Sequence, residues 1–236
     1  KKILVIFTEQ KDLLMRNGKK FSTGNHPIEA LVPMLHLQKA GFEFDIVTPT
    51  GKPVVFEMWA FPTKDKNVTA IYNELKSSFE NPIKLQDFID SSFADTATYA
   101  AVFVPGGHGA MIGIPEDKNV GKALQWAHQN DLFTISLCHG PGSFLTTTLD
   151  GNKFLYDGYK MAVFPDAVDK QTPMIGYLPG PMPWWVGQRL KDLGAQIINT
   201  KADASCHVDR RLISGASPKA ANDFGRLAAE TMLENL

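Results

Sequence analysis

The chain has 236 residues, of which 44% are hydrophobic and 21% are charged, and its formal net charge is −1. This length and composition are ordinary for a globular protein with a substantial core, and the balanced charge gives no sign of a nucleic-acid or acidic-membrane partner. No apolar run approaches the roughly 18–20 residues that cross a bilayer.

The two cysteines, Cys138 and Cys206, lie far apart in the sequence. Two thiols so placed exclude a disulfide scaffold and favour reduced thiols in a cytoplasmic protein. The strand-like segment ILVIFT follows the first two lysines directly, so we expect no secretory leader, and this start leaves open that the natural chain is longer.

Short apolar segments alternate with amphipathic ones along most of the chain. Strands are expected at residues 3–8, 42–48, 100–104, 133–138, 159–165 and 210–217. Helices are expected at residues 26–41, 119–131, 142–149 and 217–236, and residues 184–199 are expected to form a helix that passes through Gly194 into a short strand. This order predicts an α/β fold with a parallel sheet covered by helices on both faces.

Residues 51–98 interrupt this alternation. They include KPVVFEMWAFPTKDKN and ELKSSFENPIKLQDFIDSS, which predict extra helices and a hairpin. We therefore expect one domain over residues 1–236, with 51–98 as an inserted lobe or cap.

Polar and glycine-rich clusters follow three of the expected strands. PGGHG occupies 105–109, CHGPG occupies 138–142 and FPDAVD occupies 164–169, while STGNHPIE at 22–29 follows the loop after the first strand. Ligands bind an open parallel sheet at the carboxyl ends of its strands, so these clusters should meet in one cleft.

Cys138 is the candidate nucleophile. A strand-to-helix corner exposes its central side chain, and the partial positive charge of a helix start should lower the pKa of a thiol there. The alternative is a buried, inert cysteine, but the neighbouring clusters favour the nucleophile. Cys206 also precedes a histidine, yet it has no strand before it and no Gly-Pro after it, so it is interpreted as a loop residue.

His139 is the candidate proton carrier, because an imidazole has an ordinary pKa near about 6.5. It needs an orienting carboxylate, and both Asp166 and Asp169 are plausible. Neighbouring residues on a strand point to opposite faces, so only a sharp turn can bring Cys138 and His139 to one substrate. The glycines of PGGHG offer backbone N–H groups for an oxyanion. Glu29 is an ordinary first-turn acid unless its carboxyl reaches Cys138.

These segments carry a family resemblance. VFVPGGHGAMIGIPE, ISLCHGPGSFL, FSTGNHPIEALVP and AVFPDAVDKQTP resemble the ThiJ/PfpI superfamily in its HchA-like heat-shock chaperone branch, and FEMWAFPTKDKNV in the insertion also fits. The resemblance implies a flavodoxin-like sandwich with a mostly parallel central sheet and a small extra lobe. Members of this branch are known as glutathione-independent glyoxalases (glyoxalase III) and are reported to act as holding chaperones and protein deglycases.

The resemblance also implies roles for particular residues. Cys138 would be the nucleophile, His139 its partner, Asp169 the third member of a triad and Glu29 the acid held against the thiol. The oxyanion and substrate site would comprise Gly106, Gly107 and His139.

A metal site of the branch is not expected here. Relatives often bind a metal through two histidines and a glutamate, and the matching positions are Gln38, Glu43 and Leu75, of which only Glu43 can ligate. We therefore predict no metal and no cofactor.

The resulting hypothesis is a glyoxalase that converts methylglyoxal or glyoxal to a hydroxy acid through a hemithioacetal on Cys138. The nearest alternative is a deglycase of proteins or nucleotides, or a small peptidase, that uses the same thiol. A holding chaperone for unfolded proteins is a rival of another class, with apolar surface from residues 54–61 and 182–187, although these segments are more typical of core or lid packing. A redox sensor is a third possibility, since exposed thiols of low pKa oxidise readily. The family resemblance predicts a homodimer.

Overall fold

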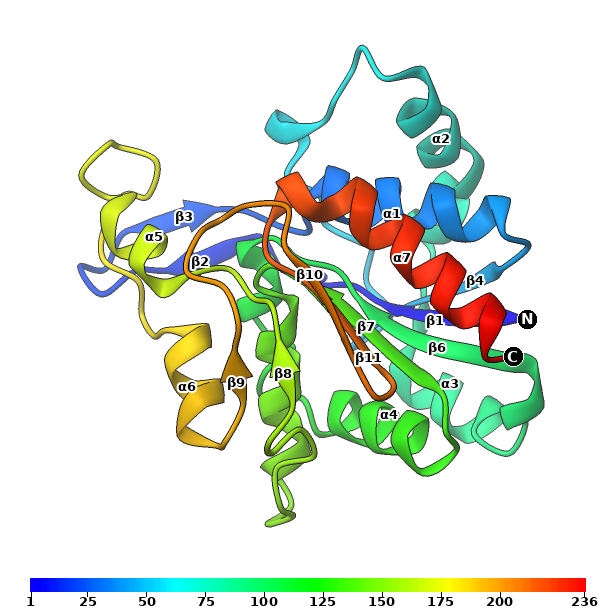
Figure 1. The fold of residues 1–236 in the computed structure, drawn as a ribbon. Helices are drawn as coiled ribbons and strands as arrows, with labels where there is room; N and C mark the ends of the chain where they lie inside the picture. Colours follow the sequence, from blue (N-terminus) through cyan, green and yellow to red (C-terminus); the bar gives the residue numbers. More distant parts are fainter.

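The computed structural model describes residues 1–236, and its centre is a sheet of seven strands in the order β10-β11-β7-β6-β1-β4-β5 (Figure 1). All neighbouring pairs are parallel except β10 with β11, which is antiparallel. The strands are β1 (Lys2–Ile6), β4 (Glu43–Thr48), β5 (Ile83–Lys84), β6 (Tyr99–Val104), β7 (Phe133–Leu137), β10 (Cys206–Asp209) and β11 (Leu212–Gly215). The predicted α/β fold with a mostly parallel sheet is confirmed.

Helices cover both faces of this sheet, as Figure 1 shows. On one face lie α1 (Pro27–Lys39), α2 (Lys66–Glu80) and α7 (Ala221–Glu234); on the other lie α3 (Leu85–Ser92) and α4 (Lys118–Gln129). Two short helices, α5 (Asp166–Gln171) and α6 (Val186–Asp192), stand beyond the edge of the sheet, beside two small sheets formed by β2 (Asp12–Leu14) with β3 (Lys20–Ser22) and by β8 (Lys160–Met161) with β9 (Gln196–Ile197). The 3-10 helices are η1 (Met58–Ala60), η2 (Thr96–Thr98), η3 (His108–Met111), η4 (Gly140–Thr148) and η5 (Pro218–Ala220).

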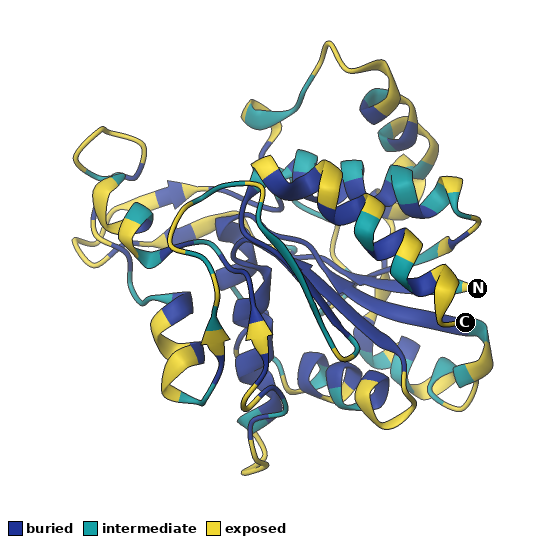
Figure 2. Cartoon of the chain, in the orientation of Figure 1, coloured by how far each residue is buried: buried dark blue, intermediate teal, exposed yellow.

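The alternation of side chains along the strands builds two cores. In β1, Ile3 and Val5 pack beneath α1 and α7, whereas Leu4 and Ile6 join the cluster beneath α3 and α4. All four side chains are fully buried, and Figure 2 shows the central strands of the sheet as a buried layer between helices whose outer sides are exposed. A strand buried on both faces needs a continuous apolar sequence, which explains the uninterrupted ILVI of the first strand.

Three expected elements differ in the structure. The expected helix at 142–149 belongs to the 3-10 helix η4, in which the hydroxyls of Thr146, Thr147 and Thr148 each donate to the carbonyl three residues earlier and so favour the tighter turn. The expected strand at 159–165 is reduced to β8, which pairs with β9 outside the main sheet. The expected hairpin in 51–98 is wrong, because β5 pairs in parallel with β4.

Segment 51–98 contains η1, α2, β5, α3 and η2. Its helix α2 packs on α1, while β5 and α3 extend the main sheet and its second face. The division into one domain with an inserted lobe stays a prediction. None of the helices combines the length and the apolar character that crossing a membrane requires.

Candidate active site

The backbone makes a sharp left-handed corner at Cys138, directly after β7. Its φ is 59°, and the next residue, His139, returns to the right-handed helical region with φ −86° and ψ −8°. Such a conformation costs a non-glycine residue about 1–3 kcal/mol, so the surrounding structure has to impose it. Here the N–H of Cys138 donates to the carbonyl of Gly215 at 2.8 Å, and its carbonyl accepts from the N–H of Phe164 at 2.9 Å.

This corner brings two adjacent side chains to one place. The Cys138 sulfur lies 3.2 Å from Nδ1 of His139, and Nε2 of His139 lies 2.6 Å from Oδ2 of Asp169. Asp169 comes from α5, and it is the aspartate of FPDAVD that faces the imidazole. Asp166 instead accepts hydrogen bonds from the backbone N–H groups of Gly187 and Gln188 at the start of α6. The two aspartates that the residue pattern left open thus have different partners.

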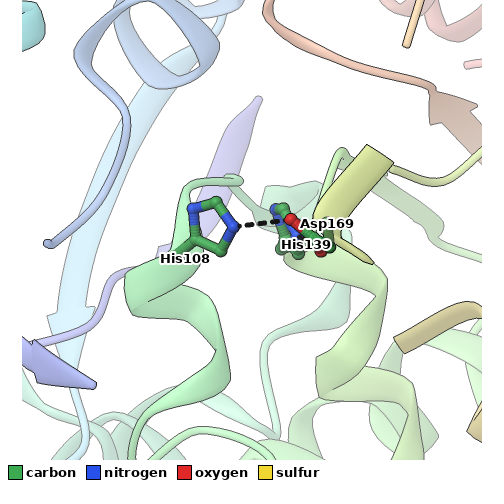
Figure 3. A group of neighbouring side chains, drawn as sticks. All are labelled: His108, His139 and Asp169. Carbon is green, nitrogen blue, oxygen red and sulfur yellow. Dashed lines mark hydrogen bonds and ion pairs between the residues drawn. The ribbon is translucent and has the colours of Figure 1, made fainter. Parts of the chain in front are cut away.

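A second histidine shares the same carboxylate. Nε2 of His108, at the start of η3, lies 2.9 Å from Oδ1 of Asp169, as Figure 3 shows. The His108 and His139 rings lie 4.1 Å apart, centre to centre. The two imidazoles outweigh the effect of burial and hold the pKa of Asp169 well below its usual range, while burial and the nearby His139 lower the pKa of His108. Sequence reasoning did not single out His108, although its place in PGGHG at a strand end was the available signal.

Glu29 projects from the first turn of α1 and is completely buried. Neither carboxyl oxygen has a hydrogen-bond partner in ordinary geometry. Burial raises the pKa of Glu29 well above its normal value, Glu57 reinforces the shift, and the neighbouring Cys138 thiol partly offsets it. Burial therefore favours the protonated form of Glu29 beside the sulfur.

The Cys138 thiol does not have the low pKa expected of a helix start. The sulfur is enclosed, and burial together with Glu29 raises its pKa well above the ordinary value, whereas the backbone N–H of Gly107 lowers it. The segment that follows is a 3-10 helix rather than the expected α-helix. The resting thiol is therefore neutral, and the expectation of an activated thiolate is corrected.

The two adjacent glycines of the PGGHG turn, Gly106 and Gly107, permit close approach to the sulfur. A Cβ atom on Gly106 would lie 2.7 Å from the Cβ of Cys138 and 2.8 Å from Oε2 of Glu29. Gly107 has a φ of 102°, which side chains rarely adopt. These features leave the backbone N–H of Gly107 at the sulfur, where an oxyanion donor is needed.

A partly open cavity of about 110 Å³ joins these groups. Its lining residues are His26, Glu29, Glu57, Gly107, His108, Cys138, His139, Phe164, Asp169, Thr172, Tyr177 and Pro218. They come from loops after β1, β6, β7 and β11 and from the 51–98 segment and the α5 region, which is the convergence that the strand ends predicted. Glu57 and Tyr177 were missed, because their segments carry no chemical motif and only the folded chain brings them here.

Two places bear on metal binding. The ligand atoms of His108, His139 and Asp169 lie within 4.8 Å of one another, but each is already in a hydrogen bond of this group. At the positions of the family's metal site, Gln38 donates to Glu74 at 2.8 Å, and Leu75 packs half-buried against the core. The absence of a metal stays a prediction.

Cys206 lies elsewhere and is not part of the cavity. It begins strand β10, so its interpretation as a loop residue is wrong; antiparallel pairing with β11 supplies the strand that its own polar sequence did not indicate. Burial raises the pKa of its thiol to about 11.

Comparison with known proteins identifies the family. No family model matches the chain, but it is 53% identical over 232 residues to protein/nucleic acid deglycase HchA of Escherichia coli O157:H7, and the match covers 98% of this chain and 81% of the relative. The same identity and coverage hold for protein/nucleic acid deglycase 1 of E. coli K12. The chain belongs to the HchA deglycase family.

Solved structures of low sequence identity share the fold of this HchA family member. The Rapid Encystment Protein of Francisella tularensis has a TM-score of 0.79 at 18% identity, with 98% of this chain and 99% of that chain covered. Glyoxalase III from Candida albicans has a TM-score of 0.74 at 23% identity, with 97% and 96% covered. DJ-1beta of Drosophila melanogaster has a TM-score of 0.58 at 15% identity, with 98% and 90% covered. The flavodoxin-like architecture expected from the sequence is thereby confirmed.

Proposed function

We propose that this HchA family member is a glutathione-independent glyoxalase that converts methylglyoxal or glyoxal to a hydroxy acid. The observation that carries the proposal is a buried sulfur that shares one cavity of about 110 Å³ with an imidazole, a buried carboxyl group and a backbone N–H. This volume is well below the roughly 300–1,000 Å³ of pockets for drug-sized ligands, which favours a dicarbonyl of two or three carbons.

The first step is addition of the thiol to the aldehyde. His139 Nδ1 takes the thiol proton as the sulfur bonds to the aldehyde carbon, and the π electrons of the carbonyl move to its oxygen. That oxygen faces the N–H groups of Gly107 and His139 and then recovers the proton, which completes a hemithioacetal. Asp169 keeps the His139 ring oriented while its charge changes.

The second step moves a hydrogen between the two carbons. A base removes the proton from the first carbon, an enediol forms, and protonation of the second carbon leaves a hydroxyacyl thioester on Cys138. Water then cleaves the thioester, which releases the hydroxy acid and restores the thiol. No oxidant or reductant is needed, because the aldehyde carbon is oxidised at the expense of its neighbour.

The test replaces the proposed nucleophile. Cys138→Ala should reduce lactate formation from methylglyoxal without glutathione to the background rate, because no covalent intermediate can form. Cys206→Ala is the matched control and should retain the activity of the unmodified protein. Substantial activity in Cys138→Ala would refute the proposal.

Deglycation is the second candidate, and the name of the 53%-identical relatives favours it. The same thiol would attack the hemiaminal carbon of a glycated amine or the corresponding adduct of a thiol. Rates on pre-formed adducts should be measured with free methylglyoxal trapped by a scavenger. If product release continues while free methylglyoxal is trapped, deglycation is supported. If product release stops, only the glyoxalase activity is supported.

The homodimer and the cytoplasmic location that the sequence suggested stay predictions. Light scattering of the purified protein measures the first.

A further inference from the structure

Asp169 orients two imidazoles in the same way. Its Oδ2 faces Nε2 of His139 at 2.6 Å, and its Oδ1 faces Nε2 of His108 at 2.9 Å. An ionised carboxylate can only accept, so both rings carry their proton on Nε2. In each ring, therefore, Nδ1 is the nitrogen with a free electron pair. For His139 this nitrogen faces the thiol.

Nδ1 of His108 has no such partner. It makes no side-chain hydrogen bond, yet it is not among the buried polar atoms that lack one, which belong to Glu29, Glu57 and Ser143. It therefore has accessible surface, and His108 lines the cavity. In Figure 3 this second ring nitrogen of His108 is turned away from the carboxylate. His108 therefore lines the cavity with its ring oriented by Asp169 and with Nδ1 free to accept a proton.

The other groups of the cavity are unsuited to act as a base on carbon. Nδ1 of His26 accepts from the N–H of Ile28 at 3.3 Å, so its other nitrogen is a donor. The carboxyls of Glu29 and Glu57 are buried, and burial raises the pKa of both. Nδ1 of His139 is directed at the sulfur, 3.2 Å away, and serves the transfer of the thiol proton to the oxygen.

From this geometry we propose that His108 is the catalytic base that moves the proton between the two carbons of the hemithioacetal. The assignment rests on the proposed glyoxalase function and names a residue for its second step. Nδ1 of His108 takes the proton from the first carbon, the C–H electron pair becomes the carbon–carbon double bond, and the second carbonyl oxygen takes a proton from Glu29. The proton on Nδ1 then passes to the second carbon, while the first hydroxyl returns its proton to Glu29 and becomes the thioester carbonyl.

The shared carboxylate also orders the steps. The two rings lie 4.1 Å apart, and one Asp169 carboxylate can balance only one positive charge. His139 must therefore return its proton to the hemithioacetal oxygen before His108 takes one from carbon. The thiol addition is therefore complete before the proton transfer at carbon begins.

The test separates a base from a mere hydrogen-bond donor. His108→Gln places an amide N–H near the position of Nε2, so the contact with Asp169 is preserved and the base is lost. His108→Asn is the complementary variant, which removes the donor to Asp169. The exposed His128→Gln at the end of α4 is the control for loss of any histidine.

In His108→Gln, lactate formation should fall by about 10²–10⁴-fold, the range that a positioned base contributes. Alkylation of Cys138 by iodoacetamide should keep its rate, because His139 and Asp169 are intact. The hemithioacetal should accumulate and be visible by intact mass as one added methylglyoxal. The isotope effect with methylglyoxal deuterated at the aldehyde carbon should rise relative to the unmodified protein.

Two results would overturn the assignment. Normal turnover in His108→Gln, whatever His108→Asn does, would show that no base is needed at this position. Loss of Cys138 alkylation in parallel with lactate in both variants would show that His108 only holds the triad together. Lactate formation by Cys138→Ala would instead remove the proposed function itself, so the two failures can be told apart.

Discussion

At the scale of single residues, the site depends on where protons rest. Glu29 and Cys138 are buried side by side, and burial raises the pKa of both. Glu29 raises the pKa of the thiol further, while the thiol partly offsets the shift of Glu29, so burial favours the neutral form of each group before substrate arrives. Asp169 is the one anion among them, and two imidazoles stabilise it. The arrangement stores a proton beside the sulfur and a base on its other side, which is what addition to a carbonyl requires.

Glu29→Gln tests this protonation state. The activity should fall by about 10²-fold or more, because an amide cannot pass a proton to the enediol oxygen. The free energy of unfolding of the variant should instead be higher than that of the unmodified protein at neutral pH. The pKa of Glu29 is raised on folding, so its contribution to stability is greatest below the ordinary pKa of 4.5 and is lost as the pH rises toward the folded pKa.

Thermal melting across a pH series measures this effect. Glu29→Gln and the unmodified protein should differ least near about pH 4, and the variant should gain relative stability as the pH rises. Each 1 kcal/mol corresponds to about 2–4 °C in Tm for a chain of this size. A difference in Tm that does not vary with pH would contradict the assignment of a protonated Glu29.

At the scale of elements, a short helix can be capped by a residue that belongs to another element. Helix α6 has no side-chain cap of its own, and its first N–H groups are satisfied by Asp166 of α5 at 2.9 and 2.8 Å. Asp166 therefore connects α5, which carries Asp169, to α6. Asp169, the other aspartate of FPDAVD, contacts the two imidazoles, whereas Asp166 caps α6.

Asp166→Ala should destabilise the protein by about 0.5–2 kcal/mol, the usual cost of losing an N-cap. Lactate formation at low temperature should stay close to that of the unmodified protein, because no group of the cavity is removed. Denaturant unfolding and the glyoxalase assay on the same preparation check both expectations. A loss of activity as large as that of Cys138→Ala would show that Asp166 does more than cap α6.

At the scale of the whole molecule, the cavity exists because four strand ends of one sheet and the 51–98 segment meet there. The charge of Asp169 is buried at this meeting point. Because its two histidine partners lower its pKa, the free energy of unfolding depends on pH. Its pKa is lowered on folding, and its contribution is therefore present above the ordinary pKa of 3.8 and lost as the pH falls below it.

Asp169→Asn should cost about 1.5–3 kcal/mol near neutral pH, the usual worth of a hydrogen bond to a charged group, and should abolish most of the activity. The difference in stability from the unmodified protein should shrink as the pH falls below about 4. Denaturant titrations at several pH values measure it. A difference that is constant across the series would contradict an ionised Asp169.

The sequence by itself determined the architecture and the place of the site. Uninterrupted apolar strands such as ILVI require burial on both faces, and the alternation with helices makes the sheet parallel, so the chemistry must collect at the strand ends. Cys138, His139 and the PGGHG turn could be located in this way because each directly follows a strand.

Only the tertiary structure decided which groups meet and in what protonation state. The difference between Asp166 and Asp169 is set by the approach of α6 to one and of two imidazoles to the other. Glu57 and Tyr177 join the site through packing between distant segments, and the pKa of Cys138 is set by its enclosure rather than by its local corner. Hydrophobic pattern is a local property that a sequence records, whereas desolvation and charge pairing depend on neighbours that only the folded chain supplies.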